Sequence, residues 1–369
     1  MKYVWQYSGW PKLSWDDSTL IKPLAEARKA QGHILGQAKY LQLKEQAEIL
    51  VEETLATSAI EGEKLDREDV RSSVAKRLGL PTAGLPEAKR NADGVVEVLL
   101  DATVNHTGKL SDKRLFGWQA ALFPTGYSGI NKINTGNWRT GKEPMQVVSG
   151  RMGKAKIHYE APPSKGVVSE MKAFFQWWNS PSEELDGILR AALAHFWFVT
   201  IHPFDDGNGR IARAITDMAL AQDEKTSLRL YSLSSQIVKE RKAYYDILER
   251  TQKGKGDITE WLKWFFDMFS RSIQGSNQLI EKAIFVGKLY EYCDDKGLNE
   301  RQRKVIKKML ECFPEEFIGG LTNQKYVAMT KISSETAKRD IKDLVLKKVL
   351  LQNEGGGRST RYQLNKEIK

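Results

Sequence analysis

The feature that most constrains this chain is a long apolar segment that leads directly into a short polar turn. The helix expected over residues 183–201 contains ILRAALAHFWFVTI, which is apolar on nearly every side. A helix without a polar face is expected to lie in the centre of a domain. The next residues, HPFDDGNGRIAR over 202–213, therefore start at the end of a buried helix. Any fold of this chain has to place this polar turn against its core.

The residue types in this turn are those that phosphate chemistry requires. His202 is a candidate general base, because the unperturbed pKa of imidazole lies near neutral pH. Asp206 is a candidate Mg²⁺ ligand. The remaining polar positions would offer backbone N–H groups at a helix start or guanidinium forks to an anion. These positions are Gly207, Asn208, Gly209, Arg210 and Arg213.

The turn resembles the core motif of the Fic family, H-x-F-x-[D/E]-G-N-G-R-x-x-R, and every fixed position of that motif is filled. Phe204 is expected to anchor the loop in the core. A polar turn between helices is the alternative, which so many matched positions disfavour. The resemblance covers about residues 50–270. It implies a helical domain that transfers AMP from ATP to a Ser, Thr or Tyr hydroxyl of a target protein.

The resemblance also implies a role for each residue of the motif. His202 would take the proton from the target hydroxyl, and Asp206 would hold Mg²⁺ that bridges the phosphates of ATP. Phosphate oxygens would be cradled by Gly207, Asn208 and Gly209, and the β- and γ-phosphates contacted by Arg210 and Arg213. De-AMPylation and transfer of another phosphate-linked group stay open as alternatives.

A second family pattern, [S/T]-x-x-x-E-[G/N], is matched by TSAIEG at residues 57–62 through Thr57, Glu61 and Gly62. By resemblance, this helix would lie over the nucleotide site, and Glu61 would pair with Arg213 in place of the γ-phosphate. The chain would then be autoinhibited. The alternative is an ordinary carboxylate before a glycine that ends a helix.

Two further features are candidates for contacts with substrates. Strands are predicted over 145–150 and 154–162, joined as a hairpin; family members carry a flap here that pairs with the backbone of the target. Lys154, Lys156 and His158 are candidates for target or phosphate contact, or belong to an ordinary exposed hairpin. Tyr245 is a candidate for contact with the adenine, although core packing explains it equally well.

The fold class expected is mainly α, with a helical Fic core, the hairpin flap and a C-terminal winged helix. We expect an N-terminal arm and helices over 1–90, the catalytic core over 91–275, a linker helix over 276–298 and a separate module over 299–369. Within these parts, single helices are predicted over 18–60, 234–251, 257–273 and 276–295.

The C-terminal module carries most of the net charge of +10, which falls within residues 300–369. Its order of three helices, a strand, a glycine turn and a strand resembles a winged helix-turn-helix. The resemblance implies DNA contact through the third helix and through a wing at residues 355–358. The candidate residues of the third helix are Ser334, Thr336, Lys338 and Arg339. A protein-binding or dimerisation module is the alternative.

Other classes are disfavoured by simple patterns. No run of about 18 apolar residues exists, so no membrane span is expected. The N-terminus lacks a secretory signal, and Cys293 and Cys312 are too far apart for a metal motif, so a cytoplasmic protein is expected. The different class of function that stays open is a nucleotide-sensing, DNA-binding regulator. A homodimer also stays open.

Overall fold

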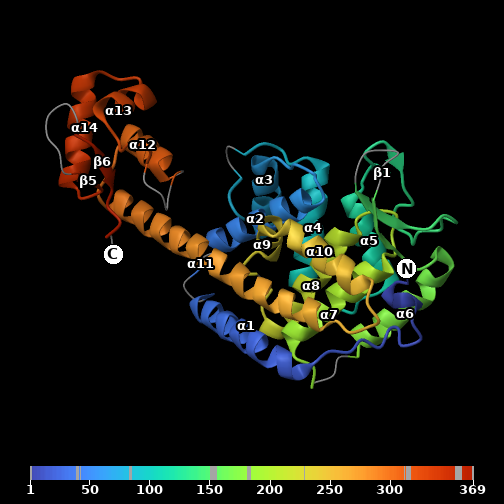
Figure 1. Cartoon of the computed structure of the whole chain (residues 1–369). Coiled ribbons are helices and arrows are strands. Elements are labelled where there is room, and N and C mark those ends of the chain that lie inside the picture. The colour runs from blue at the N-terminus through green and yellow to red at the C-terminus, as the bar shows by residue number, and fades with distance from the viewer. Residues whose placement is uncertain are drawn as a thin grey trace. The chain divides into compact units, whose positions relative to one another are not determined.

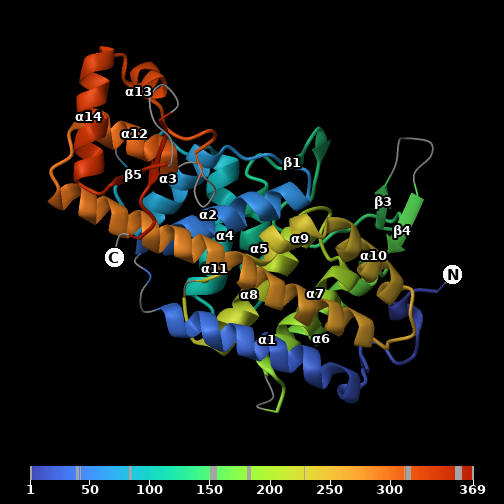
Figure 2. The same ribbon diagram turned by 60° about the vertical axis from the view of Figure 1, so that its left-hand side comes forward.

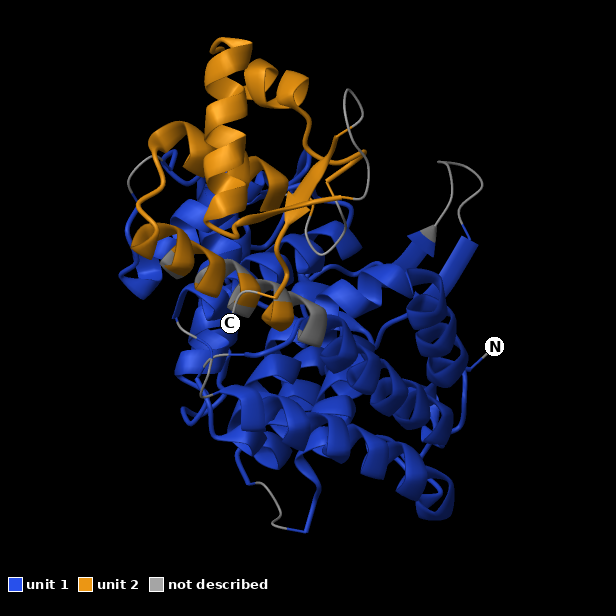
Figure 3. Cartoon of the chain, turned by 90° about the vertical axis from the view of Figure 1, so that its left-hand side faces the viewer, with its two compact units in different colours: residues 1–276 blue, residues 277–369 orange. Residues whose placement is uncertain are grey.

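The computed structural model describes residues 2–38, 41, 43–82, 85–149, 156–180, 184–227, 229–310, 312, 317–353 and 360–367. The chain divides into two compact units, residues 1–276 and 277–369 (Figure 3). The division falls within the long helix α11, Thr259–Asp295. Among the described residues, no helix is both long and apolar enough to cross a membrane.

Unit 1 is mainly helical, as the sequence predicts (Figure 1). Two short 3-10 helices, Val4–Gln6 and Ser164–Gly166, accompany its α-helices. Ahead of α11, its described α-helices are α1 Asp17–Gln37, α2 Leu43–Ile60, α3 Arg67–Leu78, α4 Arg90–Val104, α5 Asp112–Leu122, α6 Val167–Trp178, α7 Gly187–Ile201, α8 Asn208–Glu224, α9 Leu233–Lys239 and α10 Arg241–Gln252. Its strands are β1 Tyr127–Ser128, β2 Asn131–Lys132, β3 Gln146–Ser149 and β4 Lys156–Glu160.

Helix α7 is the centre of unit 1 and packs against α8 (Figure 1). It begins where the Asp186 carboxylate accepts hydrogen bonds from the N–H groups of Ile188 and Leu189, at 2.8 and 3.1 Å. Every residue from Ile188 to Ile201 is buried. The predicted central helix is therefore confirmed. It ends directly before His202, which is the first residue of the polar turn.

The helix expected over residues 18–60 is wrong, because α1 ends at Gln37 and α2 begins at Leu43. Gly32 and Gly36 lie in the last turns of α1. Glycine costs about 1 kcal/mol relative to alanine inside a helix, so two glycines one turn apart weaken the helix there. Because of this break, α1 and α2 are two separate helices.

The other helix boundaries also differ from the expectation. The separate helices predicted over 257–273 and 276–295 are the single helix α11, because the lone Gly275 between them costs too little to end a long helix. The helix predicted over 234–251 is divided at Glu240 into α9 and α10, and the Glu240 N–H bonds back to Gln236 O at 3.1 Å.

The predicted hairpin is present as the antiparallel pair β3–β4, which stands next to α10 (Figure 2). Val147 faces Tyr159, and a bulge then shifts the register so that Val148 faces Ile157. Tyr159 is buried, and its hydroxyl donates to the carbonyl oxygen of Thr200 on α7 at 2.5 Å. This contact fixes the base of the hairpin to the end of the central helix. Lys154 lies outside the described residues.

Unit 2 contains helices α12 Glu300–Leu310, α13 Asn323–Thr330 and α14 Ser334–Leu346, and strands β5 Leu350–Gln352 and β6 Tyr362–Leu364. The strands pair antiparallel, and Leu321 forms an additional bridge to Tyr362. This is the element order that the sequence predicts. The core is formed by the apolar faces of the helices, with Val305, Ile306, Met309, Leu310, Tyr326, Ile341 and Leu344 buried. The predicted wing tip at 355–358 lies outside the described residues.

Candidate active site

His202 occupies the C-cap of α7 in a left-handed conformation, with φ of 51° and ψ of 58°. Its ring nitrogen Nδ1 lies 3.1 Å from the carbonyl oxygen of Val199. A carbonyl only accepts, so Nδ1 carries the proton and the neutral ring leaves a lone pair on Nε2. Burial lowers the pKa of His202, while the hydrogen bond to Val199 opposes the shift. The geometry thus provides a neutral imidazole that can accept a proton at Nε2.

The start of α8 has the geometry of an anion site. Gly207 precedes the helix with φ of 88°, and a Cβ on this residue would lie 2.9 Å from the Phe123 ring. The first backward hydrogen bond runs from Ile211 N to Gly207 O at 3.0 Å. The N–H groups before Ile211 have no carbonyl partner inside the helix, and they carry the positive end of its dipole.

The side chain of Asn208 forms hydrogen bonds within the loop. Its side-chain amide donates to Phe204 O at 2.8 Å and accepts from Phe204 N at 2.9 Å. The Asn208 side chain therefore closes the loop, and only its backbone N–H is left to face an anion. Phe204 is fully buried, with its ring centroid 4.8 Å from that of Trp138. It anchors the loop, as expected.

Arg213 lies beneath the end of α2 and is only 2% exposed. Its Nε donates to Thr57 Oγ1 at 2.7 Å, and its Nη2 donates to Glu61 Oε1 at 2.8 Å. Burial acts to lower the pKa of Arg213, but the charge and the hydrogen bond of Glu61, together with Tyr244 and Tyr245, outweigh it and the pKa is raised. A Cβ on Gly209 would lie 2.2 Å from Glu61 Oε1, so this carboxylate rests directly on the start of α8. The structure therefore brings Thr57, Glu61 and Arg213 together.

Glu63 contacts the other motif arginine, and the sequence did not single it out. Its Oε2 accepts from Arg210 Nη1 at 2.9 Å, and the Arg210 guanidinium lies 4.8 Å from the centroid of the Phe123 ring. The position of Glu63 follows from the backbone turn at the end of α2. Gly62 N bonds to Ala59 O at 3.0 Å and Glu63 N bonds to Ser58 O at 3.0 Å, with Gly62 at φ of 84°. This is the Schellman pattern, which turns Glu61 and Glu63 toward two neighbouring arginines.

Asp206 is half-buried and held by two donors. Ser128 Oγ, at the end of β1, donates a short hydrogen bond to Asp206 Oδ2, and Gly207 N donates to Oδ1 at 2.5 Å. Within the described residues, no group of three or more His, Cys, Asp or Glu side chains could enclose a metal ion. One carboxylate fits Mg²⁺ only where phosphates and water supply the other ligands, which is the usual arrangement in phosphate-transfer sites.

Comparison with known proteins gives two family matches along this chain. Residues 109–220 match the model of the Fic/DOC family, a range that includes the whole motif at 202–213. Residues 3–80 match the model of a domain of unknown function, DUF4172, and this range contains α2 with Glu61 and Glu63. The two glutamates that contact Arg210 and Arg213 therefore lie in a range that matches a different family model from the motif.

The curated relatives are distant and are matched over a short part of their length. The protein adenylyltransferase Fic of Culex quinquefasciatus is 26% identical over 133 residues, which are 36% of this chain and 25% of that protein. The protein adenylyltransferase fic-1 of Caenorhabditis elegans is 37% identical over 76 residues, 20% of this chain and 14% of that protein. The chain thus spans about a quarter of the length of the first of these relatives.

A solved structure shows the same fold. The crystal structure of a Fic family protein from Desulfovibrio desulfuricans G20 superimposes with a TM-score of 0.54 at 16% identity. The match covers 94% of this chain and 95% of that chain. At this identity the likeness establishes the fold alone.

Tyr245 lies on α10. It is 37% exposed, and its ring lies 5.8 Å from the guanidinium carbon of Arg241. Burial raises the pKa of its hydroxyl, and the charge of Glu61 raises it further. The neighbouring Tyr244 is buried and donates to, or accepts from, His195 at 2.9 Å. Of the pair, Tyr245 is the exposed ring and Tyr244 belongs to the core.

The predicted flap residues Lys156 and His158 face α10. His158 Nδ1 lies 2.5 Å from Glu249 Oε2, and Lys156 Nζ lies 3.8 Å from Glu249 Oε1. Glu249 also accepts from Lys253. Burial would raise the pKa of Glu249, but the hydrogen bonds from Lys253 and His158 lower it to about 2. Both flap side chains therefore have an acidic protein partner in this state.

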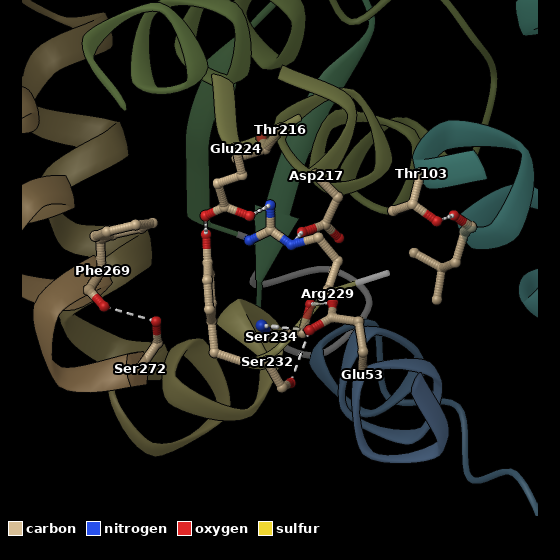
Figure 4. A network of polar contacts seen from close by, with 12 residues as sticks. Glu53, Thr103, Thr216, Asp217, Glu224, Arg229, Ser232, Ser234, Phe269 and Ser272 are labelled. Atoms are coloured by element: carbon tan, nitrogen blue, oxygen red, sulfur yellow. Dashed lines mark hydrogen bonds and ion pairs between the residues drawn. The ribbon is translucent and has the colours of Figure 1, made fainter. Parts of the chain in front are cut away.

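A buried polar network fixes α2 to the start of α9 (Figure 4). Glu53 is 3% exposed and accepts from Ser232 Oγ at 2.7 Å and from Ser234 N at 3.0 Å, at the start of α9. Arg229 lies 3.6 Å from Asp217 Oδ1 and 3.4 Å from Glu224 Oε2. The network holds the helix whose end carries Glu61, and the sequence offered no spacing by which to detect it.

Proposed function

We propose that this chain transfers AMP from ATP to a hydroxyl side chain of a target protein, with His202 as the base. The observation that carries the proposal is the adjacency of an imidazole with a free Nε2 to an anion site at the start of α8. The names of the relatives from Culex and Caenorhabditis, both protein adenylyltransferases, support the same activity.

The reaction follows from these groups. His202 Nε2 takes the proton of a Ser, Thr or Tyr hydroxyl as the hydroxyl oxygen attacks the α-phosphorus of ATP. A new O–P bond forms, the bond between the α-phosphorus and the bridging oxygen breaks, and pyrophosphate leaves. Positioning and charge neutralisation supply most of the acceleration in such transfers. A base of this kind contributes about 10²–10⁴-fold.

The residues present fit a polyphosphate. Arg210 Nε and Arg213 Nη1 are buried nitrogen atoms with no hydrogen-bond partner among the described residues. Buried donors of this kind are costly unless a ligand accepts from them. In the proposed complex these arginines contact the β- and γ-phosphates, and the N–H groups of Asn208 and Gly209 face phosphate oxygens. Asp206 would hold Mg²⁺, which neutralises charge on the phosphates, and Tyr245 would stack on the adenine.

We further propose that Glu61 inhibits transfer. Its carboxylate lies on Arg213 and against Gly209, where a phosphate would otherwise sit. ATP binding then leaves the γ-phosphate without its arginine, and the α-phosphorus is poorly aligned for attack. Thr57 and Gly62 support the carboxylate, through the Arg213 side chain and through the turn.

The test uses ATP labelled at the α-phosphate, with Mg²⁺ and a cell lysate as the source of targets. We expect strong labelling of protein by the Glu61→Gly variant, weak labelling by the unmodified chain and none by Glu61→Gly/His202→Ala. If Glu61→Gly binds ATP but labels nothing, AMP transfer is wrong. If the unmodified chain labels as strongly as Glu61→Gly, inhibition by Glu61 is wrong.

A second candidate function concerns unit 2, which we propose binds DNA as a winged helix-turn-helix. Helix α14 buries Ala337, Ile341 and Leu344 and exposes Lys338, Arg339 and Lys342 on its other side. Ser334, Thr336 and the wing would add contacts to phosphates or bases. Exposed cations on a helix of this length fit the major groove.

Binding to a fluorescent DNA duplex at increasing salt tests this second candidate. Affinity that falls steeply with salt, and falls further on substitution of Lys338, Arg339 and Lys342 by Ala, is expected. Substitution of Lys304 and Lys307 on α12 is the matched control. Equal losses in both variants, or no binding at low salt, would exclude the third helix as a DNA-reading element.

A further inference from the structure

One segment outside the motif runs along the whole of the motif loop. Asn134 N donates to Asp205 Oδ2 at 2.9 Å, and Arg139 N donates to Pro203 O at 2.9 Å. Between them, the ring of Trp138 packs on Phe204. The backbone of 134–139 therefore holds the loop that starts with His202, although 63 residues separate Arg139 from His202 in the chain.

The Arg139 side chain donates hydrogen bonds to carbonyl groups around His202. It is 3% exposed, and its Nε donates to His202 O at 2.7 Å. Its Nη2 donates a short hydrogen bond to Pro162 O, just after β4, and contacts Ile201 O at 3.4 Å. These acceptors are neutral, and two of them end α7, where the helix dipole is negative. A guanidinium supplies several donors in one rigid plane, which a lysine ammonium does not.

The backbone of His202 needs such support. Its φ of 51° is in the left-handed region, which a residue with a Cβ adopts at a cost. Residues in this conformation persist where surrounding contacts fix them, and they concentrate at active sites. The ring is fixed through Nδ1 and Val199 O, and the backbone of the same residue is fixed through Arg139.

We propose that Arg139 is a positioning residue that holds His202 in its left-handed conformation, so that Nδ1 stays on Val199 O and Nε2 stays available to the acceptor hydroxyl. The role rests on the proposed AMP transfer. Arg139 does not touch the phosphates in this account. It acts through His202, so its loss changes the rate of the chemical step and leaves nucleotide binding in place.

Besides burial, three charged groups shift the pKa of the His202 imidazole. The positive charge of Arg139 lowers the pKa of His202, while Glu61 and Asp206 raise it. Burial is the larger cause of the lowered pKa, so a neutral ring does not depend on Arg139 alone. The orientation of the ring is therefore the property that identifies the role of Arg139.

Arg190 provides a matched control, because it is a second buried arginine with a carbonyl partner. It is 7% exposed and lies near the start of α7, and its Nη2 donates to Trp178 O at 2.9 Å. Loss of either arginine is expected to lower thermal stability. Only the loss of Arg139 is expected to disturb His202.

The experiment compares Arg139→Met, Arg139→Lys and Arg190→Met in the full chain carrying Glu61→Gly. We expect Arg139→Met to lower kcat by about 10- to 100-fold with KM for ATP within about twofold, as for a displaced base. Arg139→Lys, which reaches fewer carbonyl groups, should lose about tenfold. Arg190→Met should keep kcat while its melting temperature falls. A parental kcat in Arg139→Lys, or equal losses of kcat in Arg139→Met and Arg190→Met, overturns the proposal.

A second readout does not need catalysis. The ¹⁵N shifts of the His202 ring in nucleotide-free protein, assigned with His202→Ala, report which nitrogen carries the proton. The Nδ1–H form should dominate in the parent and in Arg190→Met, and a mixture should replace it in Arg139→Met and Arg139→Lys. If the parent transfers no label, the proposed function fails and these shifts decide the role of Arg139 alone. Unchanged shifts in both Arg139 variants overturn it.

Discussion

At the scale of single residues, the proposed chemistry depends on the protonation of His202. Burial lowers the pKa of this ring below the ordinary 6.5, so the neutral form, which is the base, persists at mildly acidic pH. In the Glu61→Gly protein, the acid limb of kcat/KM should therefore have its midpoint below pH 6.5. Removing Glu61 takes away a charge that raises the pKa, which moves the acid limb in the same direction. A midpoint at or above 6.5 would show that the ring is not buried as described.

The same scale shows what the order of residues can reveal. Residues 202–213 are contiguous, so their pattern alone indicated a base, an anion site and two arginines. The Thr57 and Glu61 pattern indicated the contact with Arg213, and the structure places Glu61 2.8 Å from it. Arg139 and Glu63 were missed because they reach their partners from 63 and 147 positions away, without a shared spacing. Their roles, like those of the motif residues, stay predictions.

At the scale of elements, the Schellman turn at the end of α2 determines where both carboxylates lie. Gly62 occupies the left-handed position that an alanine adopts at a cost of roughly 1–2 kcal/mol. Gly62→Ala should loosen the turn and raise basal labelling above that of the unmodified chain. Gly79→Ala is the control, since Gly79 caps α3 in the same conformation without carrying a carboxylate to the site. Equal labelling by both variants would mean that the turn does not contribute to inhibition by Glu61.

Glu63 is the second carboxylate that this turn delivers. Its loss should free the Arg210 guanidinium for the phosphates, so Glu63→Gln in the Glu61→Gly chain should bind ATP about three- to tenfold more tightly. Glu68→Gln, on the exposed side of α3, is the control. Isothermal titration with ATP measures both. An unchanged Kd for Glu63→Gln would mean that the Arg210–Glu63 pair does not compete with nucleotide.

The elements were predicted as far as local signals reach. The end of α2 followed from Gly62, and the buried α7 followed from its uniform apolar surface. The break between α1 and α2, and the continuity of α11 through Gly275, did not follow. In each case a glycine alters the free energy of the helix by only about 1 kcal/mol, and tertiary packing decides whether the helix continues.

At the scale of the molecule, the network around Arg229 makes the stability of unit 1 depend on pH. Burial, with the charge of Glu53, raises the pKa of Asp217 to about 8. A carboxyl whose pKa is raised by folding stabilises the fold below its unfolded pKa, and this contribution is lost as pH rises toward 8. The contribution of Asp217 to the free energy of unfolding should therefore decrease between pH 5 and 8, so the unmodified chain should lose stability relative to Asp217→Asn over this range.

Urea unfolding across this pH range measures the effect. Asp246→Asn, which removes an exposed carboxylate of α10, is the control and should follow the unmodified chain. Parallel curves for Asp217→Asn and the unmodified chain would show that Asp217 is ionised in the folded state.

The fold class could be predicted because helical periodicity and the motif extend over long stretches. This network could not, because its members are single polar residues brought together by packing alone.

The contact between Glu61 and Arg213 lies within one chain, and this has a consequence for how it responds to its surroundings. A tethered carboxylate has an effective concentration that is fixed by geometry. Dilution of the protein therefore leaves it unchanged, because Glu61 and Arg213 belong to the same chain. Any restraint that this contact exerts is therefore insensitive to the abundance of the protein.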